Sequence, residues 1–151
     1  MTEYRKGILM SRMKIVRWLG YVVIGFVVLF GLIQVVPYGR DHKNPTVVQE
    51  PPWDTQTREL ARRACFDCHS NETIWPWYSN VAPVSWLVQR DVNEGRDRFN
   101  FSEWRGSLPD EIGEVIQEGE MPPWFYVLLH PKAKLTSAEK DALTQGLISI
   151  R

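Results

Sequence analysis

Both cysteines of this 151-residue chain lie in the stretch Cys65-Phe66-Asp67-Cys68-His69. On a helix, positions i, i+3 and i+4 share one face, so two thiols and an imidazole at this spacing can point at the same flat ligand. C-x-x-C-H is the attachment signature of c-type haem. The stretch therefore predicts one haem c, bound through thioethers from Cys65 and Cys68, with His69 as the proximal iron ligand.

Other uses of the two cysteines fit the sequence less well. A disulfide between them closes too small a loop to stabilise a domain much. A thioredoxin-like redox pair requires a βαβ pattern, which the flanking sequence does not have. A structural zinc ion takes four protein ligands, so His42 or His130 and carboxylates would have to complete the set. Covalent haem is the favoured interpretation.

The second axial position of the iron decides between electron transfer and chemistry on small molecules. Met121 is the only methionine after the motif, and it begins the segment Met-Pro-Pro-Trp at 121–124. The residue before a proline favours extended backbone, and two successive prolines stiffen the chain, so we expect a rigid loop that offers Met121 as the distal ligand. The alternatives are a methionine packed against Trp124, ligation by His130 to give bis-His iron, and an open or water-bound iron.

An apolar stretch lies ahead of this region. Residues 18–36 read WLGYVVIGFVVLFGLIQVV and carry no charge. About 20 such residues, rising 1.5 Å each, cross a hydrocarbon core of roughly 30 Å. The stretch predicts a transmembrane anchor over residues 15–37, in preference to a buried core helix or a cleaved signal peptide, since no Ala-x-Ala-like site comes after it.

Charge sets the expected orientation of this anchor. Only Glu3 opposes the basic residues that come first, which are Arg5, Lys6, Arg12, Lys14 and Arg17. The positive-inside rule then leaves residues 1–14 as a cytoplasmic tail in a bacterial inner membrane. Residues 38–53 would form a linker, stiffened by Pro51-Pro52, to a periplasmic domain at 54–151.

Helical signals dominate the part after the linker. Helices are predicted at Thr55–Ala64, Ser85–Gly95 and Asp110–Gly119, the last ending on a glycine that suits a C′ position. A capping box at Thr136–Glu139 begins a final helix. Its apolar stripe comprises Ala138, Ala142, Leu143, Leu147 and Ile150. Without any period-2 alternation, the fold class is all-α.

Aromatic and basic residues offer further contacts to a haem. Rings could wall it, although some could equally belong to the core or to a membrane-interface belt. These rings are Trp75, Trp77, Tyr78, Trp86, Trp104 and Trp124. Guanidinium groups suit the propionates, although each could simply lie at the surface. The arginines concerned are Arg62, Arg63, Arg90 and Arg96.

Longer strings surround the motif. They read RACFDCHSNET at 63–73, WPWYS at 75–79, APVSWLV at 82–88, EGR at 94–96, NFSEW at 100–104, MPPW at 121–124, HP at 130–131 and LT at 135–136. Over Asn44 to Ile150 they resemble the single-haem "haem-binding domain" proteins of bacteria. The resemblance implies a class I cytochrome c-like domain outside the cytoplasm, whose first and last helices cross and whose first helix carries the motif.

These features lead to expectations about function. The leading one is a membrane-anchored electron carrier, not an enzyme, that exchanges electrons with a membrane or periplasmic redox complex, since the sequence has one haem motif and no recognisable acid–base constellation. A haem-based sensor or ligand-binding module is the alternative, and a haem-dependent oxidase or peroxidase is a third. The net charge of +0 makes nucleic acid an unsuitable partner.

Overall fold

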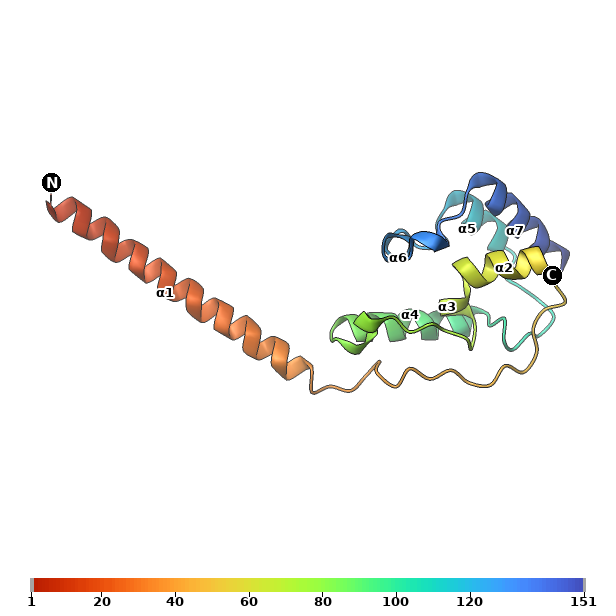
Figure 1. Cartoon of the computed structure of the whole chain (residues 1–151), viewed down its shortest axis with the longest axis horizontal. Coiled ribbons are helices and arrows are strands. Elements are labelled where there is room, and N and C mark those ends of the chain that lie inside the picture. Colours follow the sequence, from red (N-terminus) through yellow and green to blue (C-terminus); the bar gives the residue numbers. More distant parts are fainter. Residues whose placement is uncertain (1, 151) are drawn as a thin grey trace.

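A computed structural model describes residues 2–150, with side chains from Arg12 onward. A long helix, α1 (Thr2–Ile33), leads away from a small helical domain (Figure 1). The domain comprises α2 (Thr55–Ala64), α3 (Phe66–His69), η1 (Trp77–Asn80), α4 (Val84–Arg98), α5 (Ile112–Glu118), α6 (Trp124–Leu129), η2 (Pro131–Ala133) and α7 (Ser137–Ser149). Between residues 2 and 150 the only β-type pairing is one isolated bridge, Gln49 to Glu103, so the all-α prediction is confirmed.

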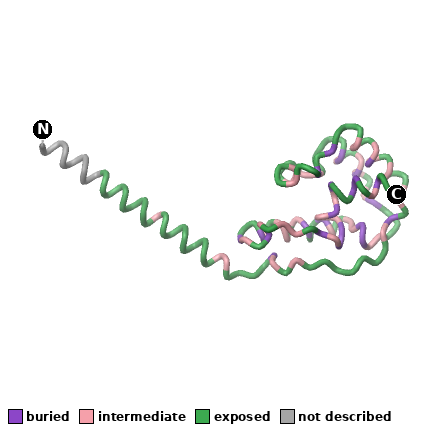
Figure 2. Tube along the Cα trace, viewed as in Figure 1, coloured by how far each residue is buried: buried purple, intermediate pink, exposed green. Residues whose placement is uncertain are grey.

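Helix α1 is a candidate membrane anchor. Its section Arg12–Ile33 is long and apolar enough to cross a bilayer, and it packs against nothing (Figure 2). The helix ends four residues before the predicted limit, because Pro37 disfavours helical backbone at Val36. The side chains of Glu3, Arg5 and Lys6, which help to set the expected orientation, lie outside the described side chains.

The core of the domain forms where its first and last helices pack. Side chains of α2, α5 and α7 meet there with Phe66 and Phe101. The two backbones approach closely at Gly146 of α7, where a Cβ would lie 2.0 Å from Thr57 Oγ1 of α2. Of the predicted stripe on α7, Leu143 and Leu147 are fully buried, while Ala138 in the first turn is exposed.

The predicted capping box of α7 is confirmed. Thr136 Oγ1 accepts a hydrogen bond from the Glu139 N–H, and the Glu139 carboxylate accepts one from the Thr136 N–H. The same carboxylate pairs with Arg63 of α2. One side chain therefore both starts α7 and ties it to the first helix of the domain.

This arrangement predicts an acid-dependent loss of stability. The Thr136 hydrogen bonds and Arg63 lower the pKa of Glu139 from 4.5 to about 2. A depressed pKa in the folded state contributes stability that is complete above the ordinary pKa and is lost as the pH falls toward about 2. We expect the urea midpoint of the detergent-solubilised chain to fall less between pH 4.5 and about 2 in Glu139→Gln than in the wild type. Glu118→Gln, at an exposed position on α5, is the control, and equal slopes for wild type and Glu139→Gln would contradict the assignment.

An extended segment, residues 34–53, runs along the domain from the end of α1, and we call it the strap (Figure 1). At its start, Gln34 exchanges two hydrogen bonds with the backbone of Ala82, of 2.9 and 3.0 Å. Further along, the N–H groups of Val48 and Gln49 donate to the Ser102 carbonyl. The predicted linker region is thus bound along its length, whereas the sequence indicated only a tether.

Candidate haem site

The motif forms a tight helical turn. Helix α2 ends at Ala64, Cys65 lies at the junction, and α3 carries the rest. The N–H groups of Cys68 and His69 donate to the Cys65 carbonyl at 3.2 and 2.9 Å, which closes the turn. Both cysteines are unpaired. Each thiol is therefore free to form a bond of its own.

Burial governs the chemistry of these thiols. It raises the pKa of Cys65 and of Cys68 to about 12, and nearby Asp67 and Asp91 add to the effect at Cys68. At neutral pH both groups are therefore neutral thiols, which disfavours thiol–disulfide exchange because that reaction uses the thiolate. Among the described residues no group of three or more His, Cys, Asp or Glu side chains is placed to hold a metal ion. His42, a potential further zinc ligand, instead stacks on Trp75 and bonds to Ser79. These observations fit thioether formation better than a zinc site.

His69 is held in the state that an iron ligand needs. Its Nδ1 lies 3.3 Å from the carbonyl oxygen of Phe99, and since a carbonyl can only accept, Nδ1 carries the proton. The Nε2 lone pair is then available for a metal. The ring stacks on Phe99 at 4.1 Å, and burial lowers the pKa of His69, which favours the neutral imidazole.

Helix α4 supports the motif from the other side. Gly95 packs directly on the backbone of α3, and a Cβ there would lie 2.4 Å from the carbonyl oxygen of Cys68. Only glycine permits this approach. The position of α4 is thus set by the same turn that carries the cysteines, and α4 then forms one wall of the adjoining space.

That space is an apolar cavity of about 460 Å³ between α4, α6 and the segment after α3. Its wall is mostly hydrophobic and includes Val84, Leu87, Val88, Val92, Phe125 and Leu129. Cys68 opens into it, whereas Cys65 and His69 are not among its lining residues. Both the volume and the lining are those of a site for a flat apolar cofactor with a few polar contacts.

Comparison with known proteins supports this assignment. A family model described as a haem-binding domain matches residues 28–148. The chain belongs to the haem-binding domain family. No curated protein and no solved structure matches the chain. The match begins within α1, so the unit shared by the family includes the end of α1 and the strap.

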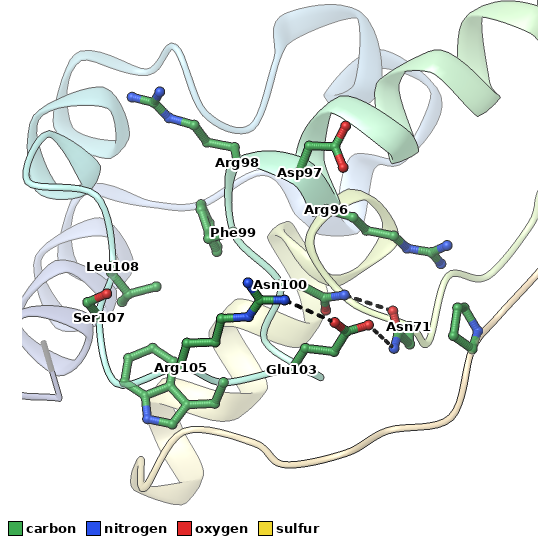
Figure 3. A pocket seen from close by; sticks show the side chains of 12 residues that line it. Asn71, Arg96, Asp97, Arg98, Phe99, Asn100, Glu103, Arg105, Ser107 and Leu108 are labelled. Carbon is green, nitrogen blue, oxygen red and sulfur yellow. Dashed lines mark hydrogen bonds and ion pairs between the residues drawn. The ribbon is translucent and has the colours of Figure 1, made fainter.

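The remaining residues predicted to contact haem lie in several places. Trp104 and Arg96 line a second, more polar cavity of about 420 Å³, beyond Phe99 (Figure 3). Arg96 also donates to Ser70 and Thr73 and to the strap, so it joins three segments. Arg90 lines the apolar cavity and pairs with Glu94. Arg63 pairs with Glu139 of α7, and pairing of these arginines with haem propionates stays a prediction.

The two candidate distal ligands occupy different places. Met121 lies in the loop between α5 and α6, its side chain is 41% exposed, and it does not line the apolar cavity. His130 does line the cavity, where its Nε2 lies 2.7 Å from the hydroxyl of Tyr78. The structure therefore brings Cys68 and His130 to one cavity and leaves Met121 outside it. Distal ligation by Met121 stays a prediction.

A polar contact that the sequence did not predict connects α6 to the motif. The hydroxyl of Tyr126 donates to Asp67 Oδ2 at 2.6 Å, and the ring of Tyr126 stacks on His130 at 4.4 Å. Burial and the Asp67 carboxylate raise the pKa of Tyr126. Asp67 also accepts from the Ile74 N–H, so the residue between the two cysteines holds both the segment after α3 and α6.

This contact predicts unequal effects for two tyrosines. Tyr126→Phe removes a hydrogen bond to a charged group and leaves Asp67 short of a donor, so we expect the free energy of unfolding to fall by about 2 kcal/mol. Tyr78→Phe removes a neutral hydrogen bond to His130 and should cost about 1 kcal/mol. Urea unfolding of the full chain in detergent measures both, and an equal or reversed order would contradict the role given to Asp67.

Proposed function

We propose that this haem-binding domain carries one haem c, bound covalently through Cys65 and Cys68, with His69 as the proximal ligand. The observation that carries the proposal is the neutral His69 ring, whose Nδ1–H donates to Phe99 and whose Nε2 is free, one residue after an unpaired thiol that opens into the apolar cavity. When bound, haem supplies an iron centre that accepts and releases one electron. The protein contributes the ligand, its orientation and the surroundings.

The residues of the site have separate tasks in this proposal. Phe99 fixes the plane and tautomer of His69 from one side. The apolar wall supplied by α4 and α6 excludes water. Such an apolar surrounding would shift the reduction potential of the iron. Asp67 and Tyr126 hold α6 at a fixed distance from the motif. None of these groups is arranged as a nucleophile with a base, which favours electron transfer over catalysis.

We propose electron transfer on the extracytoplasmic face of a bacterial inner membrane, with a membrane or periplasmic redox complex as the partner. The apolar helix α1 supports the anchoring, and the basic residues at the N-terminal end of the chain support the orientation. Anchoring two partners in one membrane raises their effective concentration toward each other. An electron carrier gains directly from this, because its partner lies in the same membrane.

A second candidate is a haem-based module that binds a small ligand at an exchangeable distal position. The specific observation in its favour is that the cavity contains the His130–Tyr78 pair, while Met121 is partly exposed. A hydroxyl and an imidazole in an otherwise apolar pocket can donate to a bound diatomic molecule. The two candidates differ in whether the iron has a permanent second ligand.

Optical spectroscopy of the purified holoprotein separates them. For an electron carrier with Met121 ligation, the oxidised protein shows the weak far-red band of sulfur–iron charge transfer, and the reduced protein resists carbon monoxide. Met121→Ala should abolish the band and permit carbon monoxide binding, whereas His130→Ala, the matched control, should do neither. Carbon monoxide binding by the wild type without any such band would favour the ligand-binding module. A carbon monoxide response confined to His130→Ala would identify bis-His iron.

A further inference from the structure

We propose that one end of the haem domain, made of η1, the start of α4 and α6, rests on the surface of the bilayer that α1 crosses. We call this end the docking face, and its outermost residues are Trp77, Trp124 and Leu128. The proposal requires α1 to be a membrane span and is independent of whether haem is bound.

The docking face comes from two segments without charge. Residues 73–89 and 121–131 contain no Asp, Glu, Lys or Arg, in a chain that is 24% charged. The first segment includes η1 and the start of α4, and the second includes all of α6. Both line the apolar cavity, so they lie at the same end of the domain. A soluble surface of this extent would ordinarily carry mixed charges.

Large apolar side chains on the docking face point to solvent. Trp77 is 79% exposed, Trp124 is 77% exposed and Leu128 is 71% exposed. On α6 the cavity is lined by Phe125, Tyr126 and Leu129. Phe125 and Leu129 each come one position after an exposed residue and are so rotated from it by about 100°. The cavity accounts for one side of α6, whereas the adjacent side, with Trp124 and Leu128, faces solvent and has no contact in the described part of the domain that explains its apolar character.

The connection to α1 places the docking face near the membrane. Gln34, near the end of the apolar stretch 18–36, bonds to both backbone groups of Ala82, between η1 and α4. Gly39 then packs on the Ser85 carbonyl of α4 so closely that a Cβ would lie 2.2 Å from the oxygen. In Figure 1, α6 and the N-terminal end of α4 form the end of the domain nearest α1, and α7 lies at the opposite end.

A lipid surface is the occupant that these observations favour. Tryptophan concentrates at the boundary between headgroups and acyl chains, because its ring is apolar and its N–H is polar. The docking face is continuous with the point where α1 ends, so a bilayer around α1 reaches it without any further partner. A second copy of the chain is a less favoured occupant. Its own docking face would have to fit against this uncharged surface while both α1 helices crossed the same membrane.

Photocrosslinking to lipid tests the proposal. The full chain is placed singly in phosphatidylcholine nanodiscs with a phospholipid whose diazirine lies near the glycerol end of its acyl chain, and adducts are mapped by mass spectrometry. Peptides with Trp77 and with Trp124–Leu128 should carry adducts at least about fivefold more often than those with Val48 or Ile148, which are 78% and 53% exposed.

Helix α1 supplies the internal control, since Phe26 and Leu29 should be labelled in any membrane-spanning chain. If α1 is labelled and the docking face is labelled no more than Val48, the proposal is overturned. The same holds if Trp77 and Trp124 are protected from water without lipid adducts, as contact with another protein would cause. If the sample lacked haem, the proposed function would be contradicted, but the pattern of lipid adducts would still test the docking face.

Discussion

Replacement of both Cys65 and Cys68 by serine should abolish covalent haem. A serine hydroxyl cannot form the thioether, and His69 alone provides only a coordinate bond that acid breaks. We expect acidified organic solvent to remove all haem from the double variant and none from the wild type, as measured by the absorbance of the extracted pellet. Each single variant should retain haem through one bond.

Two controls make this result specific to the thiols. Asp67→Asn alters the residue between the cysteines without touching either sulfur, so covalent haem should persist. Circular dichroism of the double variant tests whether the helices still form, since both positions are partly buried. Haem that resists extraction from the double variant would disprove the attachment sites, and extractable haem in wild type would disprove covalent binding altogether.

Gly95→Ala should strongly destabilise the domain. The added Cβ would lie 2.4 Å from the Cys68 oxygen and 2.9 Å from the Cys68 carbonyl carbon, and both are backbone atoms that cannot rotate away. Either α4 or the motif turn must move. Overpacking of this kind costs about 3 kcal/mol. The yield of covalent haem should fall as well, because the displaced residue, Cys68, is one of the two proposed attachment sites.

Gly113→Ala is the matched control for this change. Gly113 also lies within a helix, but its added Cβ would meet the end of the Thr144 side chain at 3.0 Å, and that methyl can yield. Alanine favours helix over glycine by about 1 kcal/mol, and this gain should offset the cost of moving the Thr144 methyl. The free energy of unfolding should therefore stay close to that of wild type. Urea unfolding and the absorbance ratio of haem to protein measure both variants. Equal losses in the two would refute a special role for the α3–α4 contact.

Local signals predicted the parts of the fold that local energies create. Thr55–Ala64 and the capping box at Thr136 were recognisable because helix periodicity and cap hydrogen bonds involve residues within four positions of each other. Helix α6 was missed for a related reason. It has only six residues, all of them apolar or aromatic, so no periodic pattern distinguishes it from a loop after two prolines.

The candidate site also has one part that local sequence predicts and one part that it does not. Cys65, Cys68 and His69 are neighbours in sequence, and their joint use follows from helix geometry alone. Asp67 and Tyr126 are 59 positions apart, and nothing near either residue indicates a hydrogen bond between them. The contacts of the strap also join residues far apart in the sequence, for example Asn71 with Thr46 and Ser102 with Val48. Such pairs depend on the final packing and leave no mark in either segment.

The bound strap limits how the domain can move relative to α1. A free linker over residues 38–53 would let the domain wander through roughly 20 Å in any direction. Gln34, Asn44 and Gln49 instead fasten the chain at intervals along the domain surface, so rotation and reach are both lost. In the proposed electron transfer, a partner in the same membrane would meet the domain at one height and in one orientation, so diffusion of that partner within the plane of the bilayer would set the frequency of productive encounters.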